Sequence, residues 1–185
     1  MQLKSGFQLP SLETTQPKEN AGVEDNLLMP ESSTGPRLIV ICGLPGSGKT
    51  TLAKALESKV GAVRFSPDDW LDALSLSLYD AATREKIEAL QWNLGKKLLS
   101  LGLIVIIEWG TWGRSERDAL RLEARALSAA VELHYLSALT DFLFDRIQHR
   151  GQETPPIQRS DFDQWVETFQ APTPEEMALF DEPLT

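Results

Sequence analysis

The sequence predicts an α/β fold in which helices cover both faces of a short parallel sheet. Continuous apolar runs alternate with helical patterns along most of the chain. Such runs are typical of strands buried on both faces, and their alternation with helices is typical of a parallel sheet. The 185 residues are 42% hydrophobic, which is enough for one buried core, so we expect one folded domain. A glycine-rich segment also separates the first apolar run from the first helical pattern.

The expected strands and helices follow each other in a regular order. Strands are predicted where short apolar runs are continuous, and helices where apolar residues recur at helical spacing. In the longest helical segment the recurring residues are Ile87, Leu90, Leu94, Leu98 and Leu101, and Gly102 is placed to end the helix. The expected strands are 37–42, 62–66, 103–108 and 131–137, and the expected helices are 50–59, 68–78, 80–102, 114–129 and 140–150.

The N-terminal segment differs in composition from the rest. Residues 1 to about 36 are rich in Pro, Ser, Thr, Asn and Glu, so we expect a flexible tail at 1–36 and the folded domain at 37–185. The start of the chain lacks an apolar stretch of signal-peptide length, and the longest apolar run is too short to span a bilayer. These features predict a cytoplasmic protein with no membrane partner.

The charge and the cysteine content exclude several classes of function. The formal net charge is −9 and the pI is about 4.8, and such an acidic surface repels a polyphosphate backbone. Nucleic acid is therefore not the partner that we expect, although a few local basic groups can still hold a small anionic substrate. Cys42 is the single cysteine, which rules out an internal disulfide and a cysteine-based metal cage.

The segment between the first strand and the first helix predicts a nucleotide site. It reads GLPGSGKTT and completes the pattern G-x-x-x-x-G-K-[ST]. Glycines let successive backbone N–H groups turn toward an anion, and the following helix adds its positive N-terminal end. We expect Lys49 to reach the terminal phosphates of ATP and Thr50 to ligate Mg²⁺. The expected phosphate-binding residues are Gly43, Pro45, Gly46, Ser47, Gly48, Lys49, Thr50 and Thr51.

An acidic pair, Asp68 and Asp69, follows the second strand. The carboxyl end of a parallel strand faces the ligand crevice, so both aspartates are expected near the phosphate loop. Phosphoryl transfer to an alcohol needs a carboxylate that orients the hydroxyl and accepts its proton. An alternative is that Ser66 or Asp68 only caps the next helix, with Pro67 in its first turn.

These motifs together resemble the small P-loop kinases related to the 5′-kinase domain of phage polynucleotide kinase. That group includes chloramphenicol phosphotransferase and zeta-toxin-type kinases, and the resemblance covers roughly Arg37 to Asp181. It implies a three-layer, nucleoside-kinase-like P-loop NTPase fold with a helical lid, ATP and Mg²⁺ as cofactors, and an alcohol acceptor. It also implies that Asp68 is the general base and that Asp69 orients the acceptor.

The third strand ends in Glu108, which stands at the Walker B position near Mg²⁺. Related kinases often have Asp there, so the longer side chain suggests contact through water, or a role in holding the substrate. Trp109 and Trp112 follow at the crevice edge, where they either stack on a substrate ring or pack under a loop. Arg114 is expected to face the acceptor, whereas we expect a solvated helix face for Arg117.

The helix at 140–150 carries two arginines, Arg146 and Arg150, that are one turn apart and therefore on one face. Related kinases have R-x-x-x-R in a lid that closes over ATP, here about 142–160. By that resemblance the two arginines neutralise charge on the transferred phosphoryl group. The alternative is a surface pairing with Asp145 or Glu153.

The function that these residues predict is ATP-dependent phosphorylation of a hydroxyl group on a small molecule. Two alternatives stay open: a polynucleotide 5′-hydroxyl kinase, and a P-loop ATPase or nucleotide switch that has no acceptor. The sequence does not identify the acceptor or the oligomeric state.

Overall fold

A four-stranded parallel sheet forms the centre of the fold. The computed structural model describes residues 35–151 and 156–184, so the tail expected at the N-terminus lies almost entirely outside the described residues. The strand order is β2-β3-β1-β4, and each neighbouring pair is parallel, which confirms the predicted α/β class. The strands are β1 Arg37–Cys42, β2 Val63–Phe65, β3 Ile104–Gly110 and β4 Ala130–Tyr135.

Seven helices surround this sheet in the described part of the chain. One expected helix is shorter than predicted: α2 ends at Ala73 rather than at residue 78, and Ser75 then takes a left-handed φ of 56°. Helices α6 and α7 were not predicted. The helices are α1 Lys49–Val60, α2 Pro67–Ala73, α3 Ala81–Ser100, α4 Arg114–Ala126, α5 Thr140–Arg150, α6 Arg159–Thr168 and α7 Pro174–Met177.

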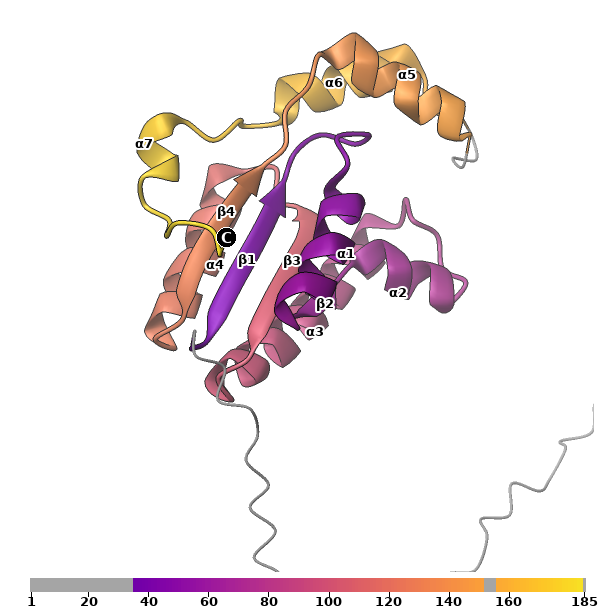
Figure 1. Ribbon diagram of the computed structural model, residues 1–185. Helices are drawn as coiled ribbons and strands as arrows, with labels where there is room; N and C mark the ends of the chain where they lie inside the picture. The colour runs from indigo at the N-terminus through magenta and orange to yellow at the C-terminus, as the bar shows by residue number, and fades with distance from the viewer. Residues whose placement is uncertain (1–34, 152–155, 185) are drawn as a thin grey trace, which may run out of the picture. The chain divides into compact units, whose positions relative to one another are not determined.

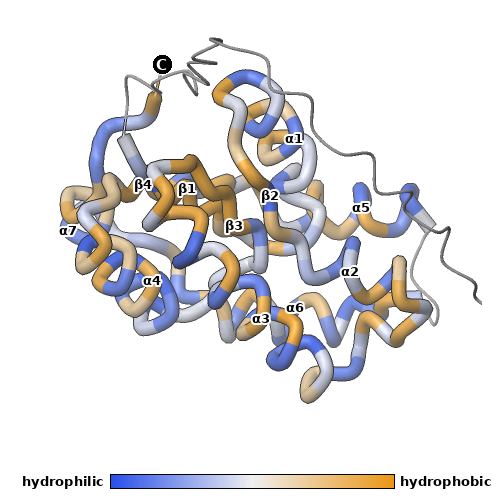
Figure 2. Tube along the Cα trace, turned by 90° about the horizontal axis from the view of Figure 1, so that it is seen from below, coloured by the Kyte–Doolittle hydropathy of each residue, from blue (hydrophilic) through white to orange (hydrophobic). Residues whose placement is uncertain are grey.

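The helices and the sheet form three layers. One core cluster joins the sheet to α3 and α4, and a second joins its other face to α1 through Ala53 and Leu56. Figure 2 shows the apolar strands between α1 on one side and α3 and α4 on the other. Alternation along β3 sends Val105 and Ile107 to the first cluster and Ile104 and Ile106 to the second.

The leucine spacing that predicts α3 does not mark its buried face. Leu90, Leu94 and Leu101 are exposed, whereas the buried side of the helix passes through Gly95. A Cβ on Gly95 would lie 3.4 Å from ring atoms of Phe65 and Trp92, which is ordinary van der Waals contact, so this side of the helix packs directly against the sheet. The buried residues of this helix are Ile87, Gln91, Trp92, Gly95 and Leu99.

The carboxyl ends of the strands point toward helices α5 and α6, which lie across that end of the sheet (Figure 1). These two helices have a small core of their own, in which Leu143 and Ile147 of α5 meet Ile157 and Phe162. Leu44 of the glycine-rich segment packs against the same cluster. Within the described residues, every helix is too short or too polar to cross a membrane.

Candidate active site

The glycine-rich segment between β1 and α1 forms a loop that only glycine fits at two positions. Gly43 has φ 147° and Gly46 has φ 81°, in the region that favours glycine. A Cβ on Gly43 would lie 2.5 Å from the carbonyl oxygen of Leu136, and a Cβ on Gly46 would lie 2.8 Å from that of Leu143. The backbone of this loop is therefore closely packed against the segment after β4 and against α5.

Lys49, the first residue of α1, folds its side chain back over this loop. Its Nζ donates hydrogen bonds to the carbonyl oxygens of Gly43, at 3.0 Å, and Leu44, at 3.1 Å. Burial lowers the pKa of Lys49, while the carboxylates of Asp68 and Glu108 oppose that shift. Both carboxylates thus favour the charged form of this lysine.

The other loop residues surround Lys49 as the pattern predicts. The Ser47 hydroxyl is buried and has no hydrogen-bond partner in residues 35–151 and 156–184, so it is available to an atom that enters the loop. Pro45 is half-buried, and Thr50 and Thr51 are exposed in the first turn of α1. Gly48 precedes the helix with a left-handed φ of 97°.

Glu108 lies at the end of β3 on the face that carries α1. Arg64 of β2 donates a hydrogen bond to Glu108 Oε1, whereas Glu108 Oε2 is buried without a partner in the described part of the chain. Burial raises the pKa of Glu108, and Arg64 and the Thr50 hydroxyl act in the opposite direction. The two residues that were predicted to serve the metal, Thr50 and Glu108, therefore lie together.

These residues fit a magnesium ion that arrives with a nucleotide. Residues 35–151 and 156–184 contain no cluster of three or more His, Cys, Asp or Glu side chains that could hold a metal. Mg²⁺ in nucleotide sites is bound through one or two carboxylates together with the phosphates and water, and it needs no cage of protein ligands. Glu108 Oε2, which has no partner among the described residues, and the Thr50 hydroxyl beside it can supply the protein's share of such ligands.

The aspartates after β2 have different partners. Ser66 is the N-cap of α2 and accepts a hydrogen bond from the Asp69 backbone N–H at 3.3 Å, so Asp68 does not cap this helix. The carboxylate of Asp68 pairs with Arg84 of α3, and that of Asp69 pairs with Arg64. Sequence analysis did not identify Arg64 or Arg84 as partners of these aspartates. The one available signal was Arg64, an arginine inside an otherwise apolar strand.

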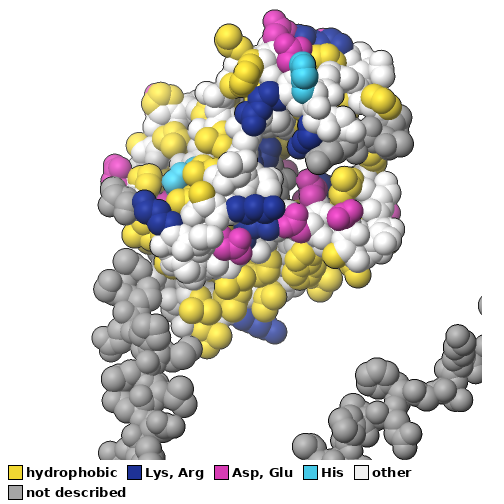
Figure 3. Space-filling model, turned by 45° about the vertical axis from the view of Figure 1, so that its right-hand side comes forward, with side chains coloured by type: hydrophobic (Ala, Val, Ile, Leu, Met, Phe, Trp, Pro, Cys, Tyr) yellow, Lys and Arg dark blue, Asp and Glu magenta, His cyan; other side chains and the backbone are white. Residues whose placement is uncertain are grey.

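Helix α5 presents one face to the phosphate loop. A Cβ on Gly48 would lie 4.0 Å from Arg146 Nη1, which places this guanidinium beside the loop. Arg146 also lies over the ring of Phe142 at 5.7 Å, and Arg150, one turn further on, lowers the pKa of Lys49. Of the two arginines that were predicted for the lid, Arg146 therefore lies beside the phosphate loop, and Arg150 follows one turn later on α5. Figure 3 shows basic side chains around a hollow in this face, with acidic side chains near its rim.

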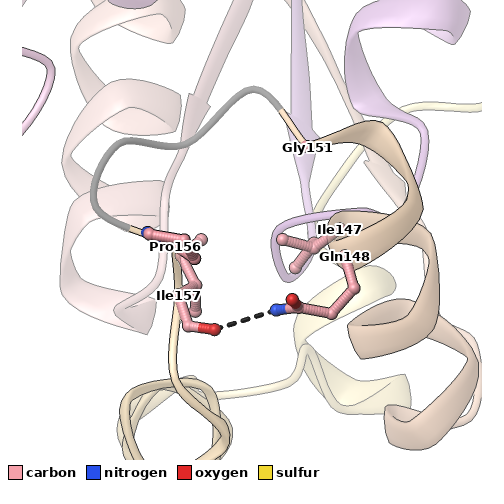
Figure 4. A pocket seen from close by; sticks show the side chains of 5 residues that line it. All are labelled: Ile147, Gln148, Gly151, Pro156 and Ile157. Atoms are coloured by element: carbon pink, nitrogen blue, oxygen red, sulfur yellow. Dashed lines mark hydrogen bonds between the residues drawn. The ribbon is translucent and has the colours of Figure 1, made fainter.

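A small pocket of about 160 Å³ lies at the end of α5. Figure 4 shows Gln148 Nε2 donating to the carbonyl oxygen of Ile157 at 2.8 Å across this pocket. Ile147 and Pro156 supply apolar walls. The pocket belongs to the packing between α5 and the segment before α6, and none of the predicted site residues lines it.

The residues that were predicted to contact the acceptor, Trp109, Trp112 and Arg114, each have different neighbours. Trp109 packs against the core cluster on the α3 and α4 face, which favours core packing over stacking on a substrate. Trp112 contacts Trp165 of α6 edge to face, with centroids 6.1 Å apart, so it joins the loop after β3 to α6. Arg114 is half-exposed and lies 3.5 Å from Asp118.

The solvated face expected for Arg117 is wrong. The side chain is fully buried and forms a two-pronged ion pair with Glu176 of α7, at 2.6 and 3.0 Å. It also donates to the carbonyl oxygens of Thr111, at 2.9 Å, and Gln170, at 2.8 Å. Arg117 therefore ties the loop after β3 to the C-terminal segment, and its charged sequence neighbours, Glu116 and Asp118, gave no sign of this.

Comparison with known proteins identifies a family and a set of uncharacterized relatives. A family profile described as an AAA domain matches residues 38–172. Proteins of Mycobacterium bovis and Mycobacterium tuberculosis, named only as uncharacterized, are 34% identical over 130 residues. The alignment covers 62% of this chain and 26% of each relative. The chain therefore spans about a quarter of the length of the curated relatives that it matches.

Several solved structures share the fold. A gluconokinase from Sinorhizobium meliloti 1021 is 22% identical with a TM-score of 0.54, over 76% of this chain and 78% of that chain. Kti12 of Chaetomium thermophilum, solved with ADP-AlF3, is 24% identical with a TM-score of 0.58, over 75% and 82%. A chain of the Pnkp1/Rnl/Hen1 RNA repair complex is 21% identical with a TM-score of 0.60, over 86% and 49%. These likenesses confirm the predicted P-loop kinase fold.

Proposed function

Because the chain belongs to the AAA-domain family and has a P-loop kinase fold, we propose that it transfers the γ-phosphate of ATP to a hydroxyl group of a small molecule. The observation that carries this proposal is the place of Asp68 directly after β2, at the same carboxyl edge of the parallel sheet from which the phosphate loop leaves β1; its charge also opposes the burial that lowers the pKa of Lys49. A carboxylate beside the phosphate-binding lysine is what transfer to an alcohol requires, and a nucleotide switch has no need of it.

In this proposal the chain's own residues share the work of binding and proton transfer. The loop from Gly43 to Gly48 and the start of α1 hold the phosphates through backbone N–H groups. Lys49 places its ammonium against the β- and γ-phosphates. Asp68 orients the acceptor hydroxyl and takes its proton, and Asp69 helps to orient the same group through its place on α2.

Thr50 and Glu108 are the residues that would hold magnesium. The ion, when bound, neutralises charge on the β- and γ-phosphate oxygens. Arg146 and Arg150 add positive charge from α5, and they exclude water when the lid packs on the phosphates. Trp112 and Arg114 are proposed to contact the acceptor from the loop after β3.

Polynucleotides are the runner-up acceptor, because one similar structure is a chain of an RNA repair complex. The net charge of −9 weighs against polynucleotides. Their binding is driven largely by the counterions that the phosphates release when Lys and Arg side chains bind to them. The test is to incubate the chain and ATP with a metabolite extract and follow phosphate transfer by mass spectrometry. Efficient labelling of 5′-hydroxyl oligonucleotides alone would favour the runner-up, and ATP hydrolysis unaffected by any acceptor would favour a switch.

Replacing Lys49 by alanine is expected to lower the rate of phosphoryl transfer about 10²- to 10³-fold. This is the usual loss when one preorganised donor that stabilises developing negative charge is removed. The Lys49 side chain bonds only to loop carbonyls among the described residues, so the melting temperature is expected to change little. Lys54→Ala, on the exposed side of the same helix, is the matched control. Turnover of Lys49→Ala at the wild-type rate under saturating ATP contradicts the role of the loop.

Replacing Arg146 by alanine is expected to lower kcat about tenfold, or about 1.4 kcal/mol of transition-state stabilisation. The Kd for ATP is expected to change less, because a lid arginine acts on charge that develops during transfer. Arg159→Ala, another exposed lid arginine, is the control and should leave both quantities unchanged. An Arg146→Ala variant with unchanged kcat and a raised KM for ATP would limit this residue to nucleotide binding.

A further inference from the structure

Arg64 of β2 contacts three carboxylates from three different elements. Its guanidinium donates to Glu108 Oε1 of β3, to Asp69 Oδ2 of α2, and to Glu57 Oε2 of α1 at 3.2 Å. Arg64 is 11% exposed and Glu108 1%, so this pair is shielded from water, whereas Asp69 and Glu57 are 48% and 39% exposed. Arg64 thus joins the metal side of the candidate site to the start of the helix that carries the proposed base.

The pairing leaves one carboxylate oxygen of Glu108 free for another ligand. Arg64 lies in register with Ile106, and Glu108 stands two residues further along the same face of β3. The guanidinium therefore reaches Glu108 Oε1 from the neighbouring strand. Glu108 Oε2 is buried and has no partner within residues 35–151 and 156–184, and the carboxylate lies beside Thr50. A buried carboxylate oxygen is costly unless something binds it.

The charges around Arg64 point to a cation at this place. Three carboxylates, on α1, α2 and β3, share one guanidinium, and when Lys49 of the phosphate loop is counted as well, one negative charge is left in excess. A divalent ion beside Glu108 and Thr50 balances that excess. Side chains that fix the ligands of a metal are worth about 10- to 100-fold in metal affinity when they are lost.

We propose that Arg64 is a positioning residue for magnesium: it holds Glu108 by one oxygen and so keeps the other turned to the ion that accompanies the nucleotide. The same guanidinium holds Asp69, which links the position of the metal to the start of α2. Arginine suits this role because its planar fork bonds two carboxylates at once, whereas lysine offers a single point of charge.

The test measures ADP binding by calorimetry, with Mg²⁺ and with EDTA. The readout is the dissociation constant of ADP in EDTA divided by its dissociation constant with Mg²⁺. This ratio reports how much magnesium adds to nucleotide affinity. Arg64→Met and Arg64→Lys are each expected to reduce this ratio about tenfold and to leave ADP binding in EDTA unchanged. Glu57→Gln removes a partner of Arg64 that lies away from the metal side, so this control is expected to keep the wild-type ratio.

A double-mutant cycle separates positioning from a general effect on the fold. Glu108→Gln is expected to lower the ratio as Arg64→Met does, and the combined variant should lose little more, because both changes remove one interaction. An unchanged ratio in a folded Arg64→Met variant overturns the proposal, as does full additivity with Glu108→Gln. If a melting curve shows that Arg64→Met does not fold, Arg64→Lys retains the charge and decides in the same way.

The proposal rests on the proposed function only for the binding of magnesium and nucleotide in the phosphate loop. A wild-type chain that binds ADP with Mg²⁺ but phosphorylates nothing in a metabolite extract contradicts transfer to a small molecule, and the ratio in the Arg64 variants can still be read. If the wild-type chain transfers phosphate and the Arg64 variants keep the wild-type ratio, only the positioning role of Arg64 is contradicted.

Discussion

Asp68→Asn is expected to bind ATP normally and to lose phosphoryl transfer by about 10²- to 10⁴-fold, the usual worth of general base catalysis. Asparagine keeps the size and polarity of the side chain but cannot accept a proton. The helix start is expected to survive, because Ser66 rather than Asp68 caps α2. The ion pair with Arg84 is partly exposed, so its loss should change stability by less than about 1 kcal/mol.

Two further variants on the same helix make this result specific. Asp69→Asn is expected to cost less than Asp68→Asn, because it disturbs orientation only. Asp72→Asn, which is exposed one turn beyond Asp68, is the matched control and should be unchanged. Single-turnover transfer should be measured for all three variants, with a melting curve for each. Near-normal transfer by Asp68→Asn refutes the assignment, and a larger loss in Asp69→Asn moves the base one residue along.

Arg117→Met is expected to destabilise the fold by about 3–5 kcal/mol, the usual cost of breaking a buried ion pair from one side. Arg117 and Glu176 are 0% and 1% exposed, so methionine would leave the carboxylate buried without its partner. The carbonyl oxygens of Thr111 and Gln170 would lose their donor as well. The measurement is the free energy of unfolding from urea titrations.

A double replacement tests the cause of that loss. Arg117→Met combined with Glu176→Leu removes both charges, and it is expected to recover a large part of the stability, because no uncompensated carboxylate remains. Arg159→Met, which breaks exposed ion pairs with Asp141 of α5 and Asp163 of α6, is the control and should unfold at the wild-type urea concentration. If Arg117→Met alone unfolds at the wild-type urea concentration, the pair does not hold the C-terminal segment in place.

The fold class and the phosphate loop were predictable because their signals are local. Continuous apolar runs fix which segments are buried strands, and each of the four expected strands is present within a few residues of its predicted bounds. The order of glycines and lysine in the loop determines its backbone, and Gly43 and Gly46 have the left-handed or otherwise strained φ that the pattern requires. Ser66 followed by Pro67 also signalled the start of α2 correctly.

The burial of particular side chains was much less predictable. Leucine spacing indicated that 80–102 is helical, yet Leu90 and Leu94 are exposed, and the buried face passes through Gln91, Gly95 and Leu99. Arg117 has the appearance of a surface residue in a charged helix, but α7, which follows much later in the chain, covers it. The short helices α6 and α7 were missed because their patterns extend over too few residues to show a period.

The sequence by itself determined that a parallel sheet holds a phosphate loop, and it named the lysine, the aspartates and the lid arginines as candidates. Only the tertiary structure decided which charges meet: Arg64 with Glu108, 44 residues apart, and Arg117 with Glu176, 59 residues apart. The physical reason is that backbone conformation and periodicity depend on neighbours in the chain, whereas ion pairs depend on strand register and helix packing. An arginine therefore looks the same in the sequence whether it is solvated or holds a buried carboxylate.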